Sequence, residues 1–133
     1  MTTMQERVAL ITGGTGGAGP AVVGVFAAQG VTVVAPYRDA AGWARLQSTL
    51  GERAPRVTGR QVDLTDAAAV AGLIADTLER HGHIDYLLNL AGGFTGGSFI
   101  DTGADVWHAM LALNLQPTLL CTRAVLPHML ARD

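Results

Sequence analysis

A glycine-rich turn between two apolar segments constrains this chain more than any other feature. Residues 12–19 read Thr-Gly-Gly-Thr-Gly-Gly-Ala-Gly and directly follow an apolar run at residues 8–12. The next segment, residues 18–29, has apolar side chains at helical spacing and ends before Gly30. A strand, a glycine-rich turn and a helix in this order favour a phosphate-binding site. Glycine lets the backbone approach a ligand closely, and a helix N-terminus offers unpaired N–H groups.

The rest of the chain alternates short apolar runs with segments of helical period, which predicts an α/β fold with a parallel sheet. We expect one domain over residues 1–133. The fourth strand is mostly apolar, as expected for a strand buried on both faces. Thr65 is the expected N-cap of the third helix, and Pro117 and Pro127 should kink or divide the long fourth segment. The predicted strands are residues 8–12, 31–35, 56–63 and 84–90, and the predicted helical segments are residues 18–29, 40–50, 66–81 and 101–132.

The composition argues against several classes of protein. The formal net charge is -2, and all nine basic residues are arginine, so we expect no nucleic-acid partner and no lysine chemistry. A single cysteine, Cys121, forms neither an internal disulfide nor a zinc site. The first seven residues are polar, and no run of 18 apolar residues occurs. We therefore expect a cytoplasmic protein with no membrane span and no metal.

Four motifs, in order along the chain, resemble those of the short-chain dehydrogenase/reductase family. They are the Thr-Gly-x-x-x-Gly-x-Gly turn at residues 12–19, Asp63-Leu64 after the third strand, Asn89-Leu90-Ala91-Gly92 after the fourth, and Asn114 in the last helical segment. The family has a second Asn where this chain has Leu90. The resemblance implies a Rossmann-like parallel sheet with flanking helices and strand order 3-2-1-4. It also implies a nicotinamide cofactor and hydride transfer to or from a small carbonyl or alcohol substrate.

The resemblance also assigns roles to residues of this chain. The turn would hold the cofactor pyrophosphate, Arg38 its 2′-phosphate, Asp63 the adenine, and residues 89–92 the nicotinamide ribose side. Asn114 matches one isolated member of the catalytic set. The expected cofactor-binding residues are Thr12, Gly13, Thr15, Gly16, Gly17, Ala18, Gly19, Tyr37, Arg38, Asp63, Leu64, Asn89, Ala91 and Gly92.

The end of the second strand favours NADP over NAD. In the family, the acid that binds the ribose of NAD lies seven residues after the glycine equivalent to Gly30, and here that position is Tyr37. Arg38 follows, and a guanidinium matches a phosphate with two hydrogen bonds. Asp39 complicates this interpretation, because a shift of one residue would bring a carboxylate near the ribose. A second glycine cluster, residues 92–97, is either close to the nicotinamide ribose or a flexible surface loop.

The catalytic Ser and the Tyr-x-x-x-Lys pair of the family are absent from this sequence. We therefore expect the cofactor-binding part of a longer oxidoreductase, truncated after the helix that follows strand four and inactive alone. The alternatives are a small nucleotide-binding or interaction module without catalysis, and a chain that another chain complements. The resemblance further implies a homo-oligomer. A bare, apolar fourth strand and an apolar last helix would make the isolated chain associate. The substrate is not indicated.

Overall fold

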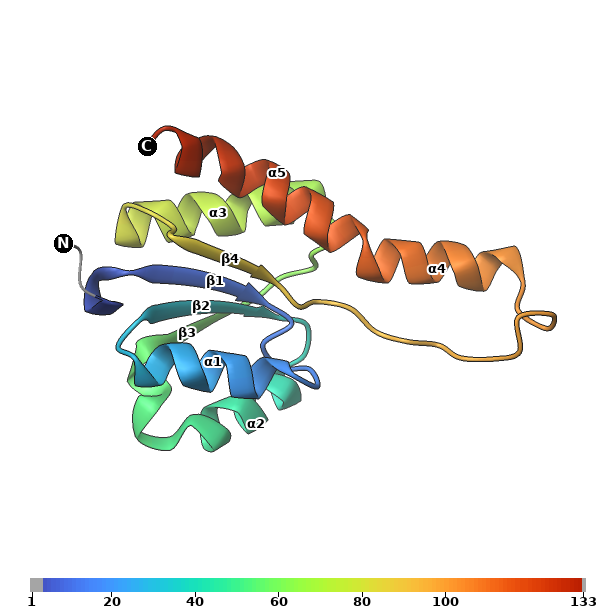
Figure 1. Cartoon of the computed structure of the whole chain (residues 1–133), viewed down its shortest axis with the longest axis horizontal. Coiled ribbons are helices and arrows are strands. Elements are labelled where there is room, and N and C mark those ends of the chain that lie inside the picture. Colours follow the sequence, from blue (N-terminus) through green and yellow to red (C-terminus); the bar gives the residue numbers. More distant parts are fainter. Residues whose placement is uncertain (1–3, 133) are drawn as a thin grey trace.

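Four parallel strands form the centre of the fold, in the order β3-β2-β1-β4. The computed structural model describes residues 4–132. Helices cover both faces of the sheet, and a further helix lies beyond its end (Figure 1). The strands are β1 (Val8–Thr12), β2 (Thr32–Tyr37), β3 (Val57–Gln61) and β4 (Tyr86–Asn89). The α-helices are α1 (Gly19–Ala28) and α2 (Ala40–Leu50) on one face, α3 (Ala67–His81) and α5 (Gln116–Leu130) on the other, and α4 (Ala104–Asn114). Two short 3-10 helices are η1 (Met4–Glu6) and η2 (Gly51–Arg56).

The alternation of side chains along β1 organises the core. Ala9 and Ile11 point to the layer of α1 and α2, whereas Leu10 points to the layer of α3 and α5. All five residues of β1 are buried, because a central parallel strand is covered on both faces. Cys121 and Val125 of α5 complete the second layer. The predicted Rossmann-like architecture and its strand order are therefore confirmed.

Two local predictions were wrong, and the prediction for the prolines was correct at Pro117 alone. The N-cap of α3 is Asp66 rather than Thr65, because the Asp66 carboxylate accepts hydrogen bonds from the N–H groups of Ala68 and Ala69, at 2.9 and 3.3 Å. The last helical segment is divided at Leu115, two residues before Pro117, which lies in the first turn of α5, where proline is tolerated; Pro127 lies inside α5 without dividing it. β4 is half-buried rather than buried on both faces, because it is an edge strand.

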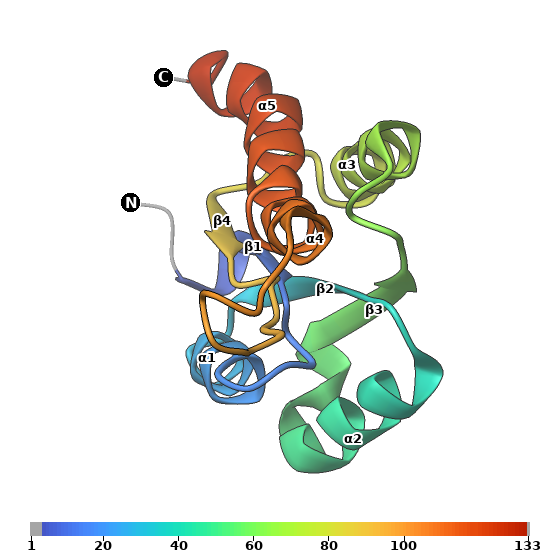
Figure 2. The same ribbon diagram turned by 90° about the vertical axis from the view of Figure 1, so that its right-hand side faces the viewer.

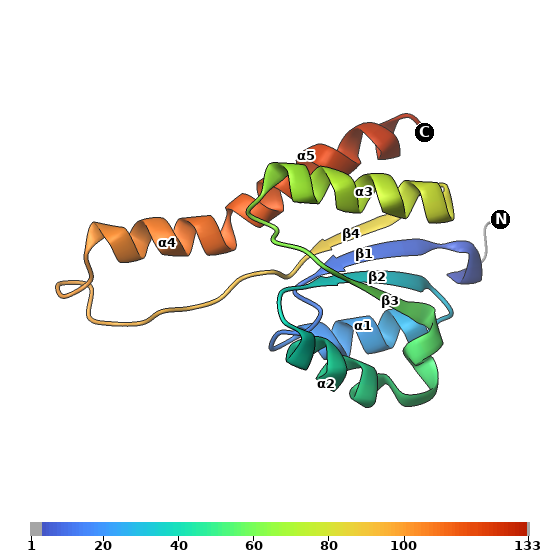
Figure 3. The same cartoon turned by 180° about the vertical axis from the view of Figure 1, so that it is seen from behind.

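α4 and the loop before it project beyond the end of the sheet (Figure 3). α4 has no buried residue. Taken together, Ala104–Leu130 is long and apolar enough, by length and composition, to cross a membrane, although α5 packs Cys121 and Val125 into the core. Exposed apolar side chains follow the two helices at residues Trp107, Leu111, Leu115, Leu119, Leu126 and Leu130.

We predict that the 133-residue chain associates through this exposed apolar helix surface. Leu111 and Leu119, which are 57% and 58% exposed, should drive the association, so replacing both with Glu should shift the chain toward monomer. Sedimentation velocity measures the change. Val25→Glu is a matched control, because Val25 is 56% exposed on α1 and lies away from this surface. A monodisperse wild-type monomer with a sharp thermal transition would contradict the prediction.

A buried carboxylate joins the two ends of the described chain. The Asp85 side chain, only 4% exposed, accepts hydrogen bonds from the Val8 N–H at 2.7 Å and from the Arg7 guanidinium at 2.8 Å. His83 and Arg132 lie 3.2 and 3.4 Å from its oxygens. Burial raises the pKa of Asp85, but the hydrogen bonds from Val8 and Arg7 and the nearby positive charges outweigh it, so the pKa lies below its ordinary value. Asp85 thus links β1, the start of β4 and the end of α5.

We predict that Asp85→Asn lowers the free energy of unfolding by about 1–3 kcal/mol at neutral pH, because it breaks charge-assisted hydrogen bonds in a buried place. The folded-state pKa is depressed, so this stabilisation is complete above the unfolded carboxyl pKa of about 3.9 and is lost as the pH falls through the folded pKa. Urea unfolding over a pH series should show wild type and variant converging in acid. Asp101→Asn, at an exposed loop residue, is the control. A constant difference at all pH values would overturn this assignment.

Candidate functional site

The turn between β1 and α1 requires glycine at two places. Gly13 has φ of 69°, and a Cβ atom there would lie 2.6 Å from the Ala91 N atom and against the Leu90 carbonyl. A Cβ atom at Gly19 would overlap the Gly13 carbonyl and lie 2.6 Å from the carbonyl carbon of Gly14. The turn is closed by a hydrogen bond of 3.0 Å from the Gly16 N–H to the Gly13 oxygen. It therefore packs against the segment after β4 and against the start of α1.

The buried Thr12 hydroxyl joins the ends of β1 and β4. It accepts hydrogen bonds from the N–H groups of Leu90 and Ala91, both at 3.2 Å, and donates to the Leu88 carbonyl at 3.4 Å. These contacts hold the backbone of residues 90–91 beside Gly13. The glycine-rich turn and the segment after β4 thus form one continuous wall.

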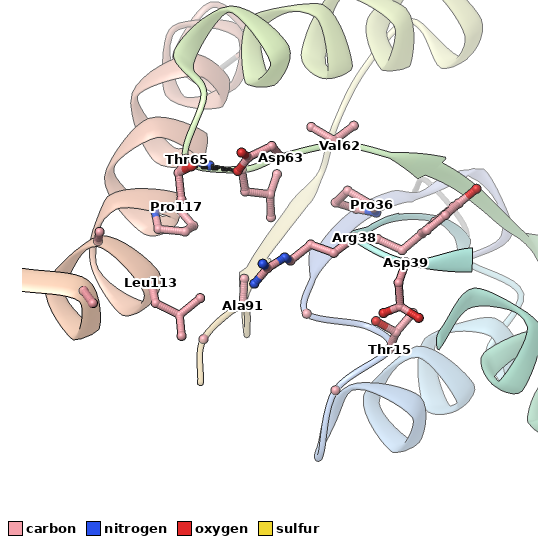
Figure 4. A pocket seen from close by; sticks show the side chains of 17 residues that line it. Thr15, Pro36, Arg38, Asp39, Val62, Asp63, Thr65, Ala91, Leu113 and Pro117 are labelled. Carbon is pink, nitrogen blue, oxygen red and sulfur yellow. Dashed lines mark hydrogen bonds between the residues drawn. The ribbon is translucent and has the colours of Figure 1, made fainter. Parts of the chain in front are cut away.

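A cavity of about 550 Å³ lies at this wall, where all four strands end (Figure 4). In parallel α/β sheets, ligands bind outside the carboxyl ends of the strands. Residues at or just after the end of each strand line one side of the cavity, and residues of α4 and α5 line the other side. The lining residues are Gly13, Thr15, Gly16, Pro36, Tyr37, Arg38, Asp39, Val62, Asp63, Leu64, Thr65, Ala91, Gly92, Ala109, Ala112, Leu113 and Pro117.

Arg38 is the cation of this cavity wall. Its side chain extends into the cavity toward Ala91 (Figure 4), and its carbonyl accepts a hydrogen bond from the Gln61 side-chain amide at 2.8 Å. Asp39 points away from Arg38, toward Thr15. The Asp39 carboxylate is the N-cap of α2 and accepts the Gly42 N–H at 2.7 Å. The Asp39 carboxylate, which the sequence also placed near the cofactor ribose, is therefore engaged in a hydrogen bond that caps α2.

Asp63 supplies a carboxylate on the facing wall. One of its oxygens accepts hydrogen bonds from the Thr65 hydroxyl at 2.7 Å and from the Thr65 N–H at 2.9 Å. These bonds, with a smaller contribution from the Arg38 charge, lower the pKa of the exposed Asp63 carboxyl below its ordinary value. Asp63 is thus a stable hydrogen-bond acceptor at neutral pH. The Gln116 amide donates to the Thr65 carbonyl at 3.0 Å and ties this loop to α5.

Two of the expected residues lie away from the cavity wall. The Asn89 amide nitrogen donates to the Thr122 hydroxyl at 3.2 Å, and its buried Oδ1 has no hydrogen-bond partner among the described residues. Asn114 holds the loop after β4: its Oδ1 accepts the Gly93 N–H at 3.1 Å, and its Nδ2 donates to the carbonyls of Gly93 and Met110, at 3.0 and 2.9 Å. Asn89 thus joins the end of β4 to α5, Asn114 holds the loop after β4, and neither side chain lines the cavity.

Only part of the glycine-rich turn lines the cavity. Thr12, Gly17, Ala18 and Gly19 belong to the turn but do not line the cavity, whereas Gly13, Thr15 and Gly16 do. Sequence reasoning missed the wall formed by α4 and α5. Ala109, Ala112 and Leu113 share a helix face by their spacing, and that spacing was the available signal. No cluster of potential metal ligands occurs among residues 4–132.

Residues 7–133 match the profile of the short chain dehydrogenase family. The chain belongs to this family. Among curated relatives, an uncharacterized oxidoreductase of Staphylococcus saprophyticus is 34% identical over 131 residues, which is 98% of this chain and 56% of the relative. The (2S)-[(R)-hydroxy(phenyl)methyl]succinyl-CoA dehydrogenase subunit BbsD of Thauera aromatica is 38% identical over 129 residues, 95% of this chain and 51% of the relative. The chain thus spans about half the length of these short-chain dehydrogenases.

Solved structures of the family share the fold of this chain. A short-chain dehydrogenase/reductase from Burkholderia xenovorans superposes with a TM-score of 0.90 at 34% identity and covers 97% of this chain and 51% of its own. A variant of actinorhodin polyketide ketoreductase with NADPH has a TM-score of 0.87 at 30% identity, covering 99% and 51%. An enzyme from Burkholderia phymatum in complex with NAD has a TM-score of 0.88 at 30% identity, covering 99% and 47%. The family therefore binds nicotinamide cofactors of both kinds.

We predict that Gly13→Ala destabilises the chain by roughly 1–3 kcal/mol, because its φ is positive and its Cβ would meet the backbone of residues 90–91. Gly17→Ala is the matched control in the same turn: its Cβ has nothing within 4 Å and its φ is not positive, so its stability should change by less than about 0.5 kcal/mol. Urea unfolding measures both. Equal losses for the two variants would show that the contact between the turn and the segment after β4 is unimportant.

Proposed function

We propose that this chain is the cofactor-binding part of an NADP(H)-dependent short-chain oxidoreductase, which transfers hydride between the nicotinamide and a small carbonyl or alcohol substrate. The observation that carries the proposal is the cavity at the strand ends, which combines a glycine-rich turn, an arginine and a carboxylate. Helix N-termini and close backbone approach suit a pyrophosphate. The chain as given would bind cofactor and catalyse no reaction.

The residues of the cavity fit the parts of a nicotinamide dinucleotide. Gly13 and Gly16 border the cavity, and without side chains there the backbone of the turn can approach a pyrophosphate closely. Asp63 is an acceptor suited to the adenine, and the Ala91–Gly92 backbone at the cavity wall is suited to the nicotinamide ribose. When bound, the nicotinamide donates or accepts the hydride.

Three residues at the end of β2 support NADP over NAD. Tyr37 occupies the position where an acid would bind the two ribose hydroxyls. Asp39 is engaged as the cap of α2. The Arg38 side chain extends into the cavity, and its guanidinium matches a 2′-phosphate in charge and geometry. The structures of relatives include both cofactors, so the preference rests on these side chains.

The candidate proton donors of this chain lie outside the cavity or are engaged in packing. The Tyr86 ring packs edge-on against Phe26, at 5.6 Å between centroids, and its hydroxyl lies 3.8 Å from the Met4 sulfur. Tyr37 is stacked on Trp43 at 5.1 Å. Neither tyrosine is followed by a lysine, since the chain has none. The reaction thus requires a Ser and a Tyr-x-x-x-Lys from polypeptide beyond these residues.

The second candidate function is a nucleotide-binding or interaction module without catalysis, which the absence of lysine favours. The coding sequence downstream of Asp133 distinguishes the two. A fifth strand bearing Ser and a following Tyr-x-x-x-Lys support the enzyme, whereas an immediate stop codon supports the module. We place the parent enzyme in the cytoplasm as a homo-oligomer, which accords with the exposed apolar surface of α4 and α5.

We predict that Arg38→Asp weakens NADPH binding at least about tenfold and changes NADH binding by less than about threefold, because only NADPH carries the 2′-phosphate that Arg38 would bind. Fluorescence titration of the 133-residue chain with each cofactor measures both. Arg45→Asp makes the same charge change at an exposed position of α2 outside the cavity, so it controls for long-range electrostatics. Equal losses for the two cofactors would exclude the 2′-phosphate role, and no binding of either by wild type would exclude the cofactor.

A further inference from the structure

An aromatic pair lies between β2 and α2, directly beside the cavity. The Tyr37 and Trp43 rings are stacked, with centroids 5.1 Å apart and planes inclined by 13°. Tyr37 lines the cavity, whereas Trp43 is partly buried against the core beneath α2. Trp43 therefore supports one face of a ring that borders the cofactor site without bordering the site itself.

The position of Trp43 depends on a glycine in β3. A Cβ atom at Gly59 would lie 2.6 Å from the Cη2 and Cζ3 atoms of Trp43. Any other residue at 59 would therefore occupy the place of the indole, and Trp43 would have to move. The Gly59 site, the indole and the Tyr37 ring form one continuous stack that leads from the β3 edge to the cavity.

This stack bears on Arg38 through the backbone of β2. Arg38 directly follows Tyr37, the last residue of β2, so a Tyr37 ring fixed by the stack fixes the backbone from which the Arg38 side chain starts. Both peptide carbonyls are also held: the Tyr37 oxygen accepts the Val62 N–H at 2.9 Å, and the Arg38 oxygen accepts the Gln61 amide at 2.8 Å. The Arg38 side chain is exposed, so the stack and these two hydrogen bonds define the backbone from which it reaches the cavity.

We propose that Trp43 is a positioning residue for nucleotide selectivity. By holding the Tyr37 ring against its indole, which lies over Gly59, it keeps that ring out of the space that a ribose 2′-phosphate needs and fixes the strand end from which Arg38 reaches the cavity. This inference rests on the proposed NADP function and extends it to a residue that does not contact the cavity. Trp43 acts through Tyr37 and Arg38, so its loss should change the preference between nucleotides more than nucleotide binding as such.

Two adenine nucleotides that differ only in the 2′-phosphate test this proposal on the 133-residue chain. Calorimetry with adenosine 2′,5′-bisphosphate and with 5′-AMP gives a ratio of dissociation constants, and a general loss of folded protein cancels from that ratio. Wild type should prefer the bisphosphate at least about tenfold. Trp43→Leu, which keeps apolar packing but removes the stack, should reduce the preference at least about fivefold. Trp43→Phe should restore it to within about twofold of wild type.

A matched control and a double variant separate positioning from folding. Trp107→Leu removes the other tryptophan, which stacks on Phe99 at 5.4 Å in the projecting segment, and should leave the ratio unchanged. Gly59→Ala displaces the indole without altering Trp43 and should reduce the ratio as Trp43→Leu does. Arg38→Ala should abolish the preference, and adding Trp43→Leu to it should change the ratio no further, because the tryptophan acts through the arginine.

The outcomes are distinct. A wild-type preference for the bisphosphate together with an unchanged ratio in Trp43→Leu overturns the role of Trp43 and leaves the NADP proposal intact. Equal wild-type affinity for the two nucleotides, or no binding of either, overturns the NADP proposal and this inference with it. A reduced ratio in Trp43→Leu that persists in the Arg38→Ala background also overturns the inference, since the effect would then bypass the arginine.

Discussion

The contact between the first turn and the segment after β4 is the constraint on which the site depends. The Thr12 hydroxyl is buried at the end of the central strand and bonds three backbone groups of residues 88–91. Gly13 follows in a conformation with positive φ, close against the same segment. Because β1 and β4 are neighbours, these contacts place the glycine-rich turn and the Ala91–Gly92 backbone on one wall. The cavity exists because this wall faces α4 and α5 across the strand ends.

Around that constraint, the structure divides neighbouring residues between structural and binding positions. Asp39 caps α2, Tyr37 stacks on Trp43, and Arg38 between them extends into the cavity. Asp63 likewise closes its own turn through Thr65 while keeping its carboxylate at the cavity wall. Within residues 37–39, one side chain thus packs at the end of β2, one extends into the cavity and one caps α2. This arrangement leaves the Arg38 guanidinium as the side chain of residues 37–39 that extends toward Ala91.

The strands and helices were largely predictable because their signals are local. The apolar runs, the glycine after α1 and the helical spacing in α3 each act over a few residues. The errors arose where two residues could serve one role or where position in the sheet mattered. Thr65 and Asp66 are both suitable N-cap residues, and Asp66 is the cap because its carboxylate accepts hydrogen bonds from two N–H groups. β4 has the composition of a central strand, and only the strand order reveals it as an edge.

The sequence by itself determined the family, the parallel sheet and the residues that follow each strand, because a strand, a glycine turn and a helix in this spacing admit few other folds. Only the tertiary structure decided which of those residues face the cavity. It turns Asn89 toward α5 and Asn114 toward the loop after β4, and it adds Ala109, Ala112 and Leu113 as an opposite wall. The physical reason is that side-chain direction depends on partners distant in sequence. Asn89 finds Thr122 in α5, 33 residues away, and Trp43 finds its space over Gly59 in another strand.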